Sequence, residues 1–467
     1  MFKCTGVCSK CGRCRNSAMM SGANDRKTKM LEYPPDFTAD TGRPGFGTAF
    51  DIGTTTVVGM MWDLGRGEQI ATAAKTNPQN EFGMDVISRI TFCGSDGENL
   101  ELLRSRITGC LNEILEELCE KSGIDKHDVN EVTVCGNTTM SHLFAGYPPM
   151  TLALAPFHPA YTGTLNMSAE EARLDINEEG RVTVLPNIAG HVGGDITAGI
   201  VASRVLDKHE LTVFIDIGTN GEIVLTNGED SYACSTAAGP AFEGSAIKHG
   251  MRAATGAIER ISIKEDGDVE FLTIGECEPQ GICGSGLIDA IAQMLDSKLI
   301  SKTGRLISAD DADRKKLAPG FRERLCEIDG QRCFVLVSKE SGEDIYITQN
   351  DIREIQLAKG AIAAGIQLML GKMGKAAEDI ECVVIAGAFG NYIDKASAVR
   401  IGVLPDVGMD RIISAGNTAG AGVSMALASA KEMKLAENVV SEIKHVDLAA
   451  MEEFQNTYLA AMAFRQI

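Results

Sequence analysis

The sequence predicts an α/β protein with two similar lobes, preceded by a short cysteine-rich arm that binds metal. Three observations lead to this prediction. The chain has 467 residues, which is too many for one compact hydrophobic core. The run AFDIGTTTVVGM from Ala49 recurs as FIDIGTNGEIVL from Phe214, so that Asp51 and Asp216 stand 165 residues apart in a duplicated pattern. Four cysteines lie within eleven residues near the start, at Cys4, Cys8, Cys11 and Cys14.

Apolar alternation and turn residues define the elements of the first lobe. Residues 48–62 predict two strands joined by a Gly/Thr turn, and residues 64–67, Leu-Gly-Arg-Gly, are typical of a hairpin turn. Residues 131–135 predict a short β-branched strand, which Gly-Asn-Thr-Thr and a helix-like run follow.

The second lobe starts on the same plan. Residues 211–217 predict a strand, residues 218–221 a turn and residues 222–225 a returning strand. Residues 382–386 predict a buried strand that runs into a glycine-rich turn, and residues 417–420 open the last apolar helix. Between them, apolar residues at spacings of three and four predict a helix with one buried face: Ile355, Ala358, Ile362, Ile366 and Met369.

The charge distribution argues against nucleic acid as a partner. The formal net charge is −20, and binding to a phosphate backbone needs basic surface. Residues 1–30 are the exception, with seven Lys or Arg against one acidic residue. This basic arm could offset the negative charge of a thiolate-bound cluster or steer the arm toward an acidic partner.

The sequence predicts a cytoplasmic protein that does not span a membrane. The first twenty residues lack the apolar centre of a secretory signal. Residues 132–169 contain no Asp, Glu, Lys or Arg, but four prolines there would break a spanning helix. Without export, the 14 cysteines are expected to be reduced thiols or metal ligands.

The repeated hairpin suits a phosphate and a divalent cation. Glycine in a tight turn lets backbone N–H groups point into a concavity, and Thr54 and Thr55 add hydroxyl groups there. An aspartate at the end of each strand suits Mg²⁺, which prefers oxygen ligands and often keeps waters between itself and the protein. Two copies of the hairpin indicate this chemistry far better than one would.

These motifs resemble those of the actin, Hsp70 and sugar-kinase superfamily, in which a nucleotide binds in a cleft between two duplicated lobes. Residues 51–55 (DIGTT) match its first phosphate motif, residues 216–222 (DIGTNGE) its second, and residues 385–391 (IAGAFGN) its adenosine motif. Residues 190–195 (GHVGGD) lie where that superfamily crosses between its lobes.

Further runs resemble the reductive activators of corrinoid proteins. They are CGNTTMSHLFAG from Cys135, LPNIAGHVGGDITAG from Leu185, AAGPAFEG from Ala237, GICGSGLID from Gly281 and LAKGAI from Leu357. The resemblance covers residues 46 to about 440. It implies an ATPase that returns an inactive Co(II) corrinoid to Co(I) by passing one electron from an iron–sulfur cluster.

The resemblance also implies roles for individual residues. Asp51 and Asp216 would hold Mg²⁺, directly or through water, and Asp195 would orient the attacking water. The residues that would contact ATP, in phosphate and nucleoside motifs, are Gly53, Thr54, Thr55, Gly218, Thr219, Asn220, Gly387, Gly390 and Asn391.

The cysteine arm has the spacing C-x3-C-x2-C-x2-C. Two-residue gaps let one loop wrap successive corners of a cube, which favours a [4Fe–4S] cluster. Zinc sites usually join two cysteine pairs from separate turns, so zinc is a weaker alternative, as is another cluster type or no metal. The first three cysteines also match radical S-adenosylmethionine enzymes, but Cys14 offers a fourth ligand and no β/α barrel follows.

One departure from the family concerns the electron centre. Many members carry a plant-type ferredoxin domain before the ATPase, and the roughly 45 residues before Phe46 are too few for that fold. We expect a domain layout of a cysteine-rich arm (1–16), a linker (17–45), a first ATPase lobe (46–208) and a second lobe with insertions (209–467).

Three other functions would use parts of the same pattern. A small-molecule kinase would leave the metal arm without a task. Activators of the 2-hydroxyacyl-CoA dehydratase type hold one cluster between two subunits, with cysteines inside the ATPase fold. An Hsp70-like binding protein would need a client-binding domain after the ATPase. The expected partners are therefore a corrinoid protein of a methyltransferase system and an upstream electron donor, and a homodimer stays open.

Overall fold

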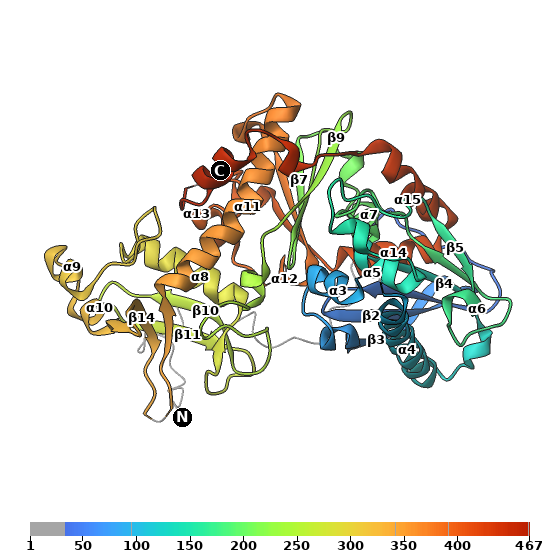
Figure 1. Cartoon of the computed structure of the whole chain (residues 1–467), viewed down its shortest axis with the longest axis horizontal. Coiled ribbons are helices and arrows are strands. Elements are labelled where there is room, and N and C mark those ends of the chain that lie inside the picture. The colour runs from blue at the N-terminus through green and yellow to red at the C-terminus, as the bar shows by residue number, and fades with distance from the viewer. Residues whose placement is uncertain (1–32, 95, 341, 391, 466) are drawn as a thin grey trace.

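Two six-stranded sheets with matching strand order form the frame of the molecule (Figure 1). The computed structural model describes residues 33–94, 96–340, 342–390, 392–465 and 467. The first sheet has the order β3-β2-β1-β4-β6-β5 and the second β17-β16-β7-β8-β9-β18. The first contains β1 (Phe46–Ile52), β2 (Thr56–Asp63), β3 (Glu68–Thr76), β4 (Val129–Gly136), β5 (Leu165–Ser168) and β6 (Arg181–Val184). The second contains β7 (Thr212–Ile217), β8 (Gly221–Thr226), β9 (Ser231–Thr236), β16 (Cys382–Ala386), β17 (Ile412–Gly416) and β18 (Lys444–His445).

Strand directions repeat between the two sheets, which confirms the predicted duplication. In the first, β1, β2 and β3 form an antiparallel meander, while β4 runs parallel to β1 and β6 parallel to β4. In the second, β7, β8 and β9 form the meander, while β16 runs parallel to β7 and β17 parallel to β16. The central strands are buried on both faces, which explains their nearly continuous apolar runs.

The two duplicated hairpins differ in length. Ile52 pairs with Val57 across the first turn, whereas Ile217 pairs with Gly221 across the second. The second turn is therefore one residue shorter, and it places Glu222 directly opposite Asp216.

Helices cover both faces of the first sheet. The long helix α4 (Gly97–Ser122) packs on one face in a core with Phe50, Ile52 and Met61. Helix α7 (Gly194–Ser203) and helix α14 (Thr418–Ala428) pack together in a second core, which also contains residues of β1 and β7. Because α14 comes from the last part of the chain, the two lobes share this core.

Helix α11 (Gln349–Met373) crosses the second sheet over β8 and β9. The five apolar positions predicted to face the core are buried as expected. However, Lys359, Ala363 and Leu370 are buried too, so the prediction of a single buried face was wrong. Helix α16 (Phe454–Ala461) packs on α11 from another side, against Lys359 and Ala363.

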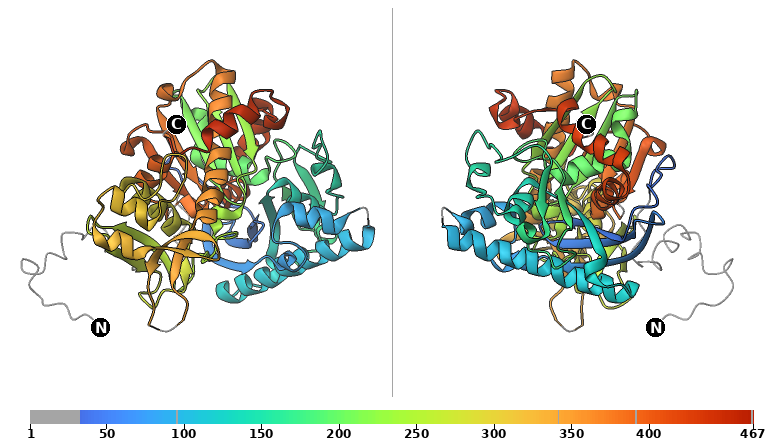
Figure 2. Two further views of the ribbon diagram at one scale, coloured as in Figure 1. Left: turned by 60° about the vertical axis from the view of Figure 1, so that its left-hand side comes forward. Right: turned by 90° about the vertical axis from the view of Figure 1, so that its right-hand side faces the viewer.

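An insertion between β9 and α11 extends the second lobe at one end of the molecule (Figures 1 and 2). It contains two three-stranded sheets, of order β11-β10-β12 and β13-β14-β15. Its elements are β10 (Ala257–Ile263), β11 (Val269–Thr273), β12 (Gly281–Ile282), α8 (Gly284–Asp296), α9 (Ala309–Arg314), α10 (Pro319–Arg324), β13 (Leu325–Ile328), β14 (Gln331–Val337) and β15 (Ile345–Thr348).

The remaining α-helices of the described residues lie outside this insertion. They are α3 (Val86–Cys93), α5 (Thr138–Ala145), α6 (Ala169–Ala172), α12 (Gly387–Gly390), α13 (Lys395–Ile401) and α15 (Ala430–Glu442).

Residues 33–45, which the sequence places in the linker, lie against the first lobe. The rings of Tyr33 and Phe37 contact Trp62, with centroids 5.8 and 6.4 Å away. The N–H of Asp40 donates to the carbonyl of Ala428, and Arg43 forms an ion pair with Glu131. This part of the predicted linker has no helix or strand, but it is attached along its length. Across the described ranges, no helix is long and apolar enough to cross a membrane.

Candidate functional site

Asp51 and Asp216 occupy equivalent places at the ends of the two central strands. Asp51 pairs in register with Cys135 on β4, whose Sγ lies 3.9 Å from Asp51 Oδ1. Asp216 is flanked by Glu222 on β8 and by Ala386 on β16. The duplication therefore presents one carboxylate per lobe, each at the carboxyl end of a strand that precedes a tight turn.

Asp195 joins these two carboxylates from the first turn of α7. Burial, followed by the negative charge of Asp195, raises the pKa of Asp51 and of Asp216 to about 7 each. Burial also raises the pKa of Asp195 to about 6. The pKa of Glu222 lies well above its usual range, through burial and through the charges of Asp195 and Asp216. All four side chains keep partial contact with solvent, so they line one accessible, strongly acidic region.

This acidic region has no cation of its own. Within the described part of the chain, no Lys, Arg or His side chain acts on the pKa of these four acids. Buried carboxylates are normally paired or bound to a metal ion, so the set fits a divalent cation. Among the residues that the structure describes, no group of three or more His, Cys, Asp or Glu side chains could hold a metal ion by itself. That arrangement suits Mg²⁺, which usually takes one or two carboxylates together with water and phosphate oxygens.

The first hairpin turn presents free backbone donors. The N–H of Gly53 closes the turn by donating to the carbonyl of Thr56, at 3.0 Å. Among the residues that the structure describes, the N–H groups of Thr54 and Thr55 have no acceptor. Asn137 donates to Thr54 Oγ1 at 2.9 Å and fixes that hydroxyl. The turn thus offers two backbone N–H groups to an anion.

The second hairpin turn is built in the same way. The N–H of Gly218 donates to the carbonyl of Asn220 at 2.9 Å, while the N–H groups of Thr219 and Asn220 find no acceptor in the described ranges. Thr219 Oγ1 donates to Glu243 Oε1 at 2.7 Å. A Cβ added at Gly218 would meet no protein atom nearer than 3.9 Å, so this backbone faces open space.

Gly387 brings the predicted adenosine motif against Asp216. Its φ of +82° favours glycine, and a Cβ there would stand 2.5 Å from Asp216 Oδ1. Gly390 lies in the short helix α12, where a Cβ would meet Ile385 at 2.7 Å. The structure thus brings Gly387, in the predicted adenosine motif, next to Asp216, in the second predicted phosphate motif. Asn391 and the four arm cysteines, Cys4, Cys8, Cys11 and Cys14, lie outside the described residues.

Several polar residues at this site had no role in the sequence analysis. Glu222 lies opposite Asp216, and Asn417 at the start of α14 hydrogen-bonds the carboxylate of Asp51. Asn137 and Glu243 fix the hydroxyls of the two turns. A signal for Glu222 was present, because a three-residue turn after Ile217 sets it across from Asp216. The others come from distant segments and have no local pattern.

Comparison with known proteins now decides the family. Residues 46–208 match the RACo middle region, and residues 210–467 match the C-terminal domain of RACo, the ASKHA domain. The chain belongs to the RACo family. The resemblance to reductive activators of corrinoid proteins, and to the actin, Hsp70 and sugar-kinase superfamily, is therefore confirmed.

Two relatives of this RACo-family chain carry functional names. It is 40% identical over 425 residues to the corrinoid activation enzyme RamQ of Eubacterium limosum, covering 90% of this chain and 71% of that protein. It is 26% identical over 458 residues to the [Co(II) methylated amine-specific corrinoid protein] reductase of Methanosarcina barkeri, covering 90% and 77%. A solved reductive activator for corrinoid,iron-sulfur protein superimposes with a TM-score of 0.78 at 39% identity, covering 91% of this chain and 67% of that one.

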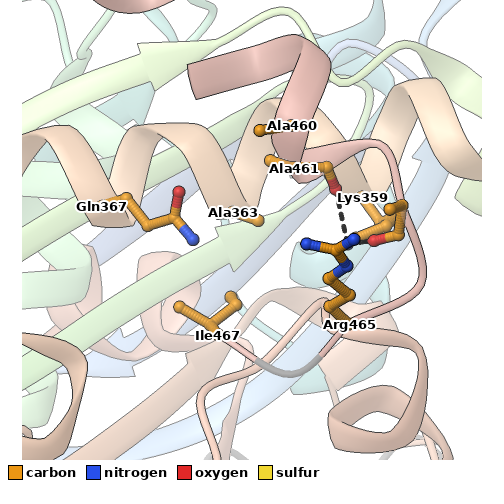
Figure 3. Close-up of a pocket in the computed structure, with 8 residues that line it drawn as sticks. Lys359, Ala363, Gln367, Ala460, Ala461, Arg465 and Ile467 are labelled. Atoms are coloured by element: carbon orange, nitrogen blue, oxygen red, sulfur yellow. Dashed lines mark hydrogen bonds between the residues drawn. The ribbon is translucent and has the colours of Figure 1, made fainter. Parts of the chain in front are cut away.

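A separate cavity of about 150 Å³ lies between α11 and the C-terminal segment (Figure 3). Lys359 lines it and donates from Nζ to the carbonyls of Ala461 and Ala463, at 2.6 and 2.8 Å. None of the acids or turn residues described above lines this cavity. Lys359 therefore anchors the end of α16 rather than belonging to the acidic site.

Proposed function

We propose that this protein is an ATP-dependent reductive activator that returns the Co(II) form of a corrinoid protein to Co(I). The observation that carries the proposal is the likeness to two proteins named for corrinoid activation and Co(II) corrinoid reduction, each over 90% of the chain. The paired hairpins and their carboxylates give the ATPase part a physical basis. Rival functions of the same superfamily lack comparable support.

In the proposed ATPase site, the two turns bind phosphate oxygens through their free N–H groups. These groups belong to Thr54 and Thr55 in one lobe and to Thr219 and Asn220 in the other. The turn glycines Gly53 and Gly218 allow the backbone to approach the phosphates, and Gly387, Gly390 and Asn391 would lie along the nucleoside.

Mg²⁺, when bound, supplies positive charge that neutralises the phosphates and the surrounding carboxylates. Asp51 and Asp216 would hold it, directly or through water, and this fits four half-buried acids on whose pKa no basic side chain of the described residues acts. Asp195 lies between the two lobes and would orient the attacking water. Its carboxylate accepts the N–H of Ile196 at 2.8 Å, which fixes the side chain.

The proposed electron centre is a [4Fe–4S] cluster held by the four thiolates of the arm, Cys4, Cys8, Cys11 and Cys14. The chemistry that the cluster would supply is one electron for the reduction of Co(II) to Co(I), and an upstream donor would restore that electron. Because the step is uphill, ATP can assist it only by binding two conformations of the complex differently.

The proposal extends to the setting of the protein. The arm (1–16) and linker (17–45) would carry the cluster toward the cobalt, while lobes 46–208 and 209–467 bind the nucleotide. The corrinoid protein would belong to a methyltransferase system in the cytoplasm, and the activator would work as a homodimer or a monomer.

A direct test follows the cobalt oxidation state without oxygen. The protein is mixed with a Co(II) corrinoid protein of a methyltransferase system and a chemical reductant, and the Co(I) absorbance is recorded with and without Mg-ATP. We expect Co(I) to appear faster with Mg-ATP in the wild type, and Asp216→Asn to remove that acceleration.

Asp230→Asn serves as the matched control. Asp230 lies at the opposite end of the β8–β9 pair and forms an exposed ion pair with Lys444 at 2.8 Å. Its loss should leave the reaction unchanged, because exposed ion pairs contribute little. Equal Co(I) formation with and without Mg-ATP, or full activity of Asp216→Asn, would refute the proposal.

A further inference from the structure

Arg89, in α3, is a fully buried cation directly behind the first hairpin turn. None of its surface is exposed, and its five N–H donors have five acceptors. Nε donates to the carbonyl of Gly83 at 2.9 Å, and Nη2 donates to the carbonyl of Thr54 and to Asn80 Oδ1, each at 2.5 Å. Nη1 contacts Gln79 Oε1 at 3.2 Å and Met140 Sδ at 3.1 Å.

All five of these acceptors are uncharged. In the part of the chain that the structure describes, no carboxylate forms an ion pair with Arg89. Asp85, which accepts hydrogen bonds from Ser88, acts on the pKa of Arg89 only through its charge. Burial lowers the pKa of Arg89 to about 10, which leaves it protonated at neutral pH. A buried charge without a directly bonded counter-ion is unfavourable, so its retention points to an anion that reaches the same place.

Asn77 supports the same turn from the same side. Its Nδ2 donates to the carbonyl of Gly53, and its backbone N–H donates to the carbonyl of Thr55, each at 2.9 Å. Asn77 is itself fully buried. Together with Arg89, it binds the carbonyl oxygens of three successive residues of the turn, Gly53, Thr54 and Thr55.

Holding these carbonyls fixes the direction of the free N–H groups. In a planar trans peptide, the C=O and the next N–H point in opposite directions. The N–H groups of Thr54 and Thr55 therefore point away from Asn77 and Arg89, toward the accessible side of the turn. Hydrogen bonds in series also polarise each other, so the guanidinium strengthens the Thr55 N–H as a donor. Among the described residues, no side chain supports the carbonyls of Gly218 and Thr219 in this way.

We infer that Arg89 and Asn77 are positioning residues that pre-orient the first turn for a nucleotide phosphate, and that the charge of Arg89 is the buried counter-charge of that phosphate. The inference deepens the proposed function and rests on it. Neither residue touches the ligand, since both act through the peptide groups of residues 53–55.

The test compares ligands with and without phosphates. Binding of Mg-ATP, Mg-ADP and adenosine is measured by titration calorimetry for the wild type and for Arg89→Met. Because a hydrogen bond to a charged group is lost behind the turn, we expect Mg-ATP and Mg-ADP to bind at least about tenfold more weakly. Adenosine should change by less than about threefold, because it has no phosphate.

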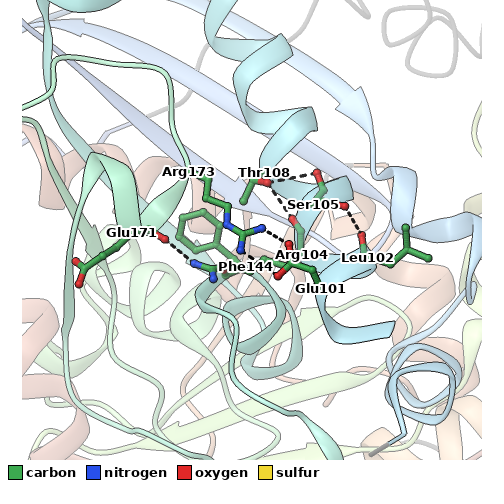
Figure 4. A network of polar contacts seen from close by, with 8 residues as sticks. All are labelled: Glu101, Leu102, Arg104, Ser105, Thr108, Phe144, Glu171 and Arg173. Atoms are coloured by element: carbon green, nitrogen blue, oxygen red, sulfur yellow. Dashed lines mark hydrogen bonds and ion pairs between the residues drawn. The ribbon is translucent and has the colours of Figure 1, made fainter. Parts of the chain in front are cut away.

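Arg104→Met is the matched control. Arg104 also serves main-chain oxygens, donating to the carbonyls of Phe144 at 3.1 Å and Glu171 at 2.5 Å, but away from the turn (Figure 4). The Arg104→Met variant should have lower thermal stability, but its affinities for Mg-ATP, Mg-ADP and adenosine should not change selectively. Asn77→Ala provides a second probe if Arg89→Met does not fold, with the same selective loss expected.

The outcomes separate the inference from the proposed function. A wild-type protein that binds neither Mg-ATP nor Mg-ADP would refute the proposed function. A wild type that binds them, with variants that lose adenosine and Mg-ATP equally or lose neither, would overturn the role of Arg89 and Asn77. Selective loss of the phosphate-bearing ligands supports it.

Discussion

Replacing Gly387 with alanine separates backbone strain from displacement of a functional carboxylate. At a φ of +82°, a side chain strains the backbone by about 1 kcal/mol. The new Cβ would also stand 2.5 Å from Asp216 Oδ1, whereas ordinary contacts begin at 3.4 Å, so the carboxylate must move by about 0.9 Å. A misplacement of about 1 Å at a reacting centre can lower the rate about a hundredfold.

Gly374→Ala supplies the comparison that this argument needs. Gly374 ends α11 with a φ of +68°, and a Cβ there would have no neighbour within 4 Å. It carries the same kind of backbone strain without the contact. Both variants should lose about 1 kcal/mol of unfolding free energy or more, measured by thermal denaturation. Only Gly387→Ala should lose ATP hydrolysis by about a hundredfold, measured as phosphate release.

The reasoning fails if Gly387→Ala hydrolyses ATP as fast as the wild type. Such a result would mean that Asp216 tolerates the shift, or that it takes no part in hydrolysis. A loss of activity in Gly374→Ala of the same size would instead show that backbone strain alone explains the effect.

Four further predictions concern protons and metal. Burial raises the pKa of Asp51 and Asp216 to about 7, so protons compete with Mg²⁺ for these carboxylates below that pH. Calorimetry should therefore show that Mg-ADP binds more tightly at about pH 8 than at about pH 6. The gain in affinity should be smaller in Asp216→Asn. Because these raised values make the folded state bind more protons than the unfolded state, the unfolding free energy of the nucleotide-free protein should fall from about pH 4 to about pH 7. Burial lowers the pKa of Lys359 to about 8, so the unfolding free energy should rise between about pH 8 and about pH 10.5, and Lys359→Met should lack this rise in denaturant titrations. Replacing Cys4, Cys8, Cys11 and Cys14 by serine should remove bound iron and sulfide, measured per chain. The variant should form no Co(I) but should still bind Mg-ATP. An unchanged iron content would contradict the cluster assignment.

The parts of the fold that could be predicted are those with local signals. Each duplicated strand carries its own apolar run, ends in Asp-Ile and is followed by Gly-Thr in the turn, so one stretch of about ten residues is sufficient to identify it. The hairpin turn at residues 64–67 and the strand at 382–386 were predicted for the same reason and are confirmed. The parallel strand β4 was also predicted from its β-branched residues.

The parts that could not be predicted depend on contacts between distant residues. Arg89 reaches Thr54 across 35 residues, and Asn137 reaches the same residue across 83. Neither side chain stands in a pattern that distinguishes it from an ordinary helix arginine or a capping asparagine. Lys359 falls within an apolar helix, and only the position of α16 shows why a lysine can be buried there.

The shared core around α14 has a consequence for how the protein is made. One face of the first sheet is covered by α7 and α14, and Leu427 of α14 lies against Gly47 of β1. During synthesis, residues 46–208 leave the ribosome long before residue 428, so β1 and β4 lack part of their cover until the chain is nearly complete. A fragment that ends at residue 208 should therefore expose apolar surface and aggregate, although it contains all six strands of the first sheet. The shared core, which can form only after α14 has been made, joins the two lobes into one folding unit.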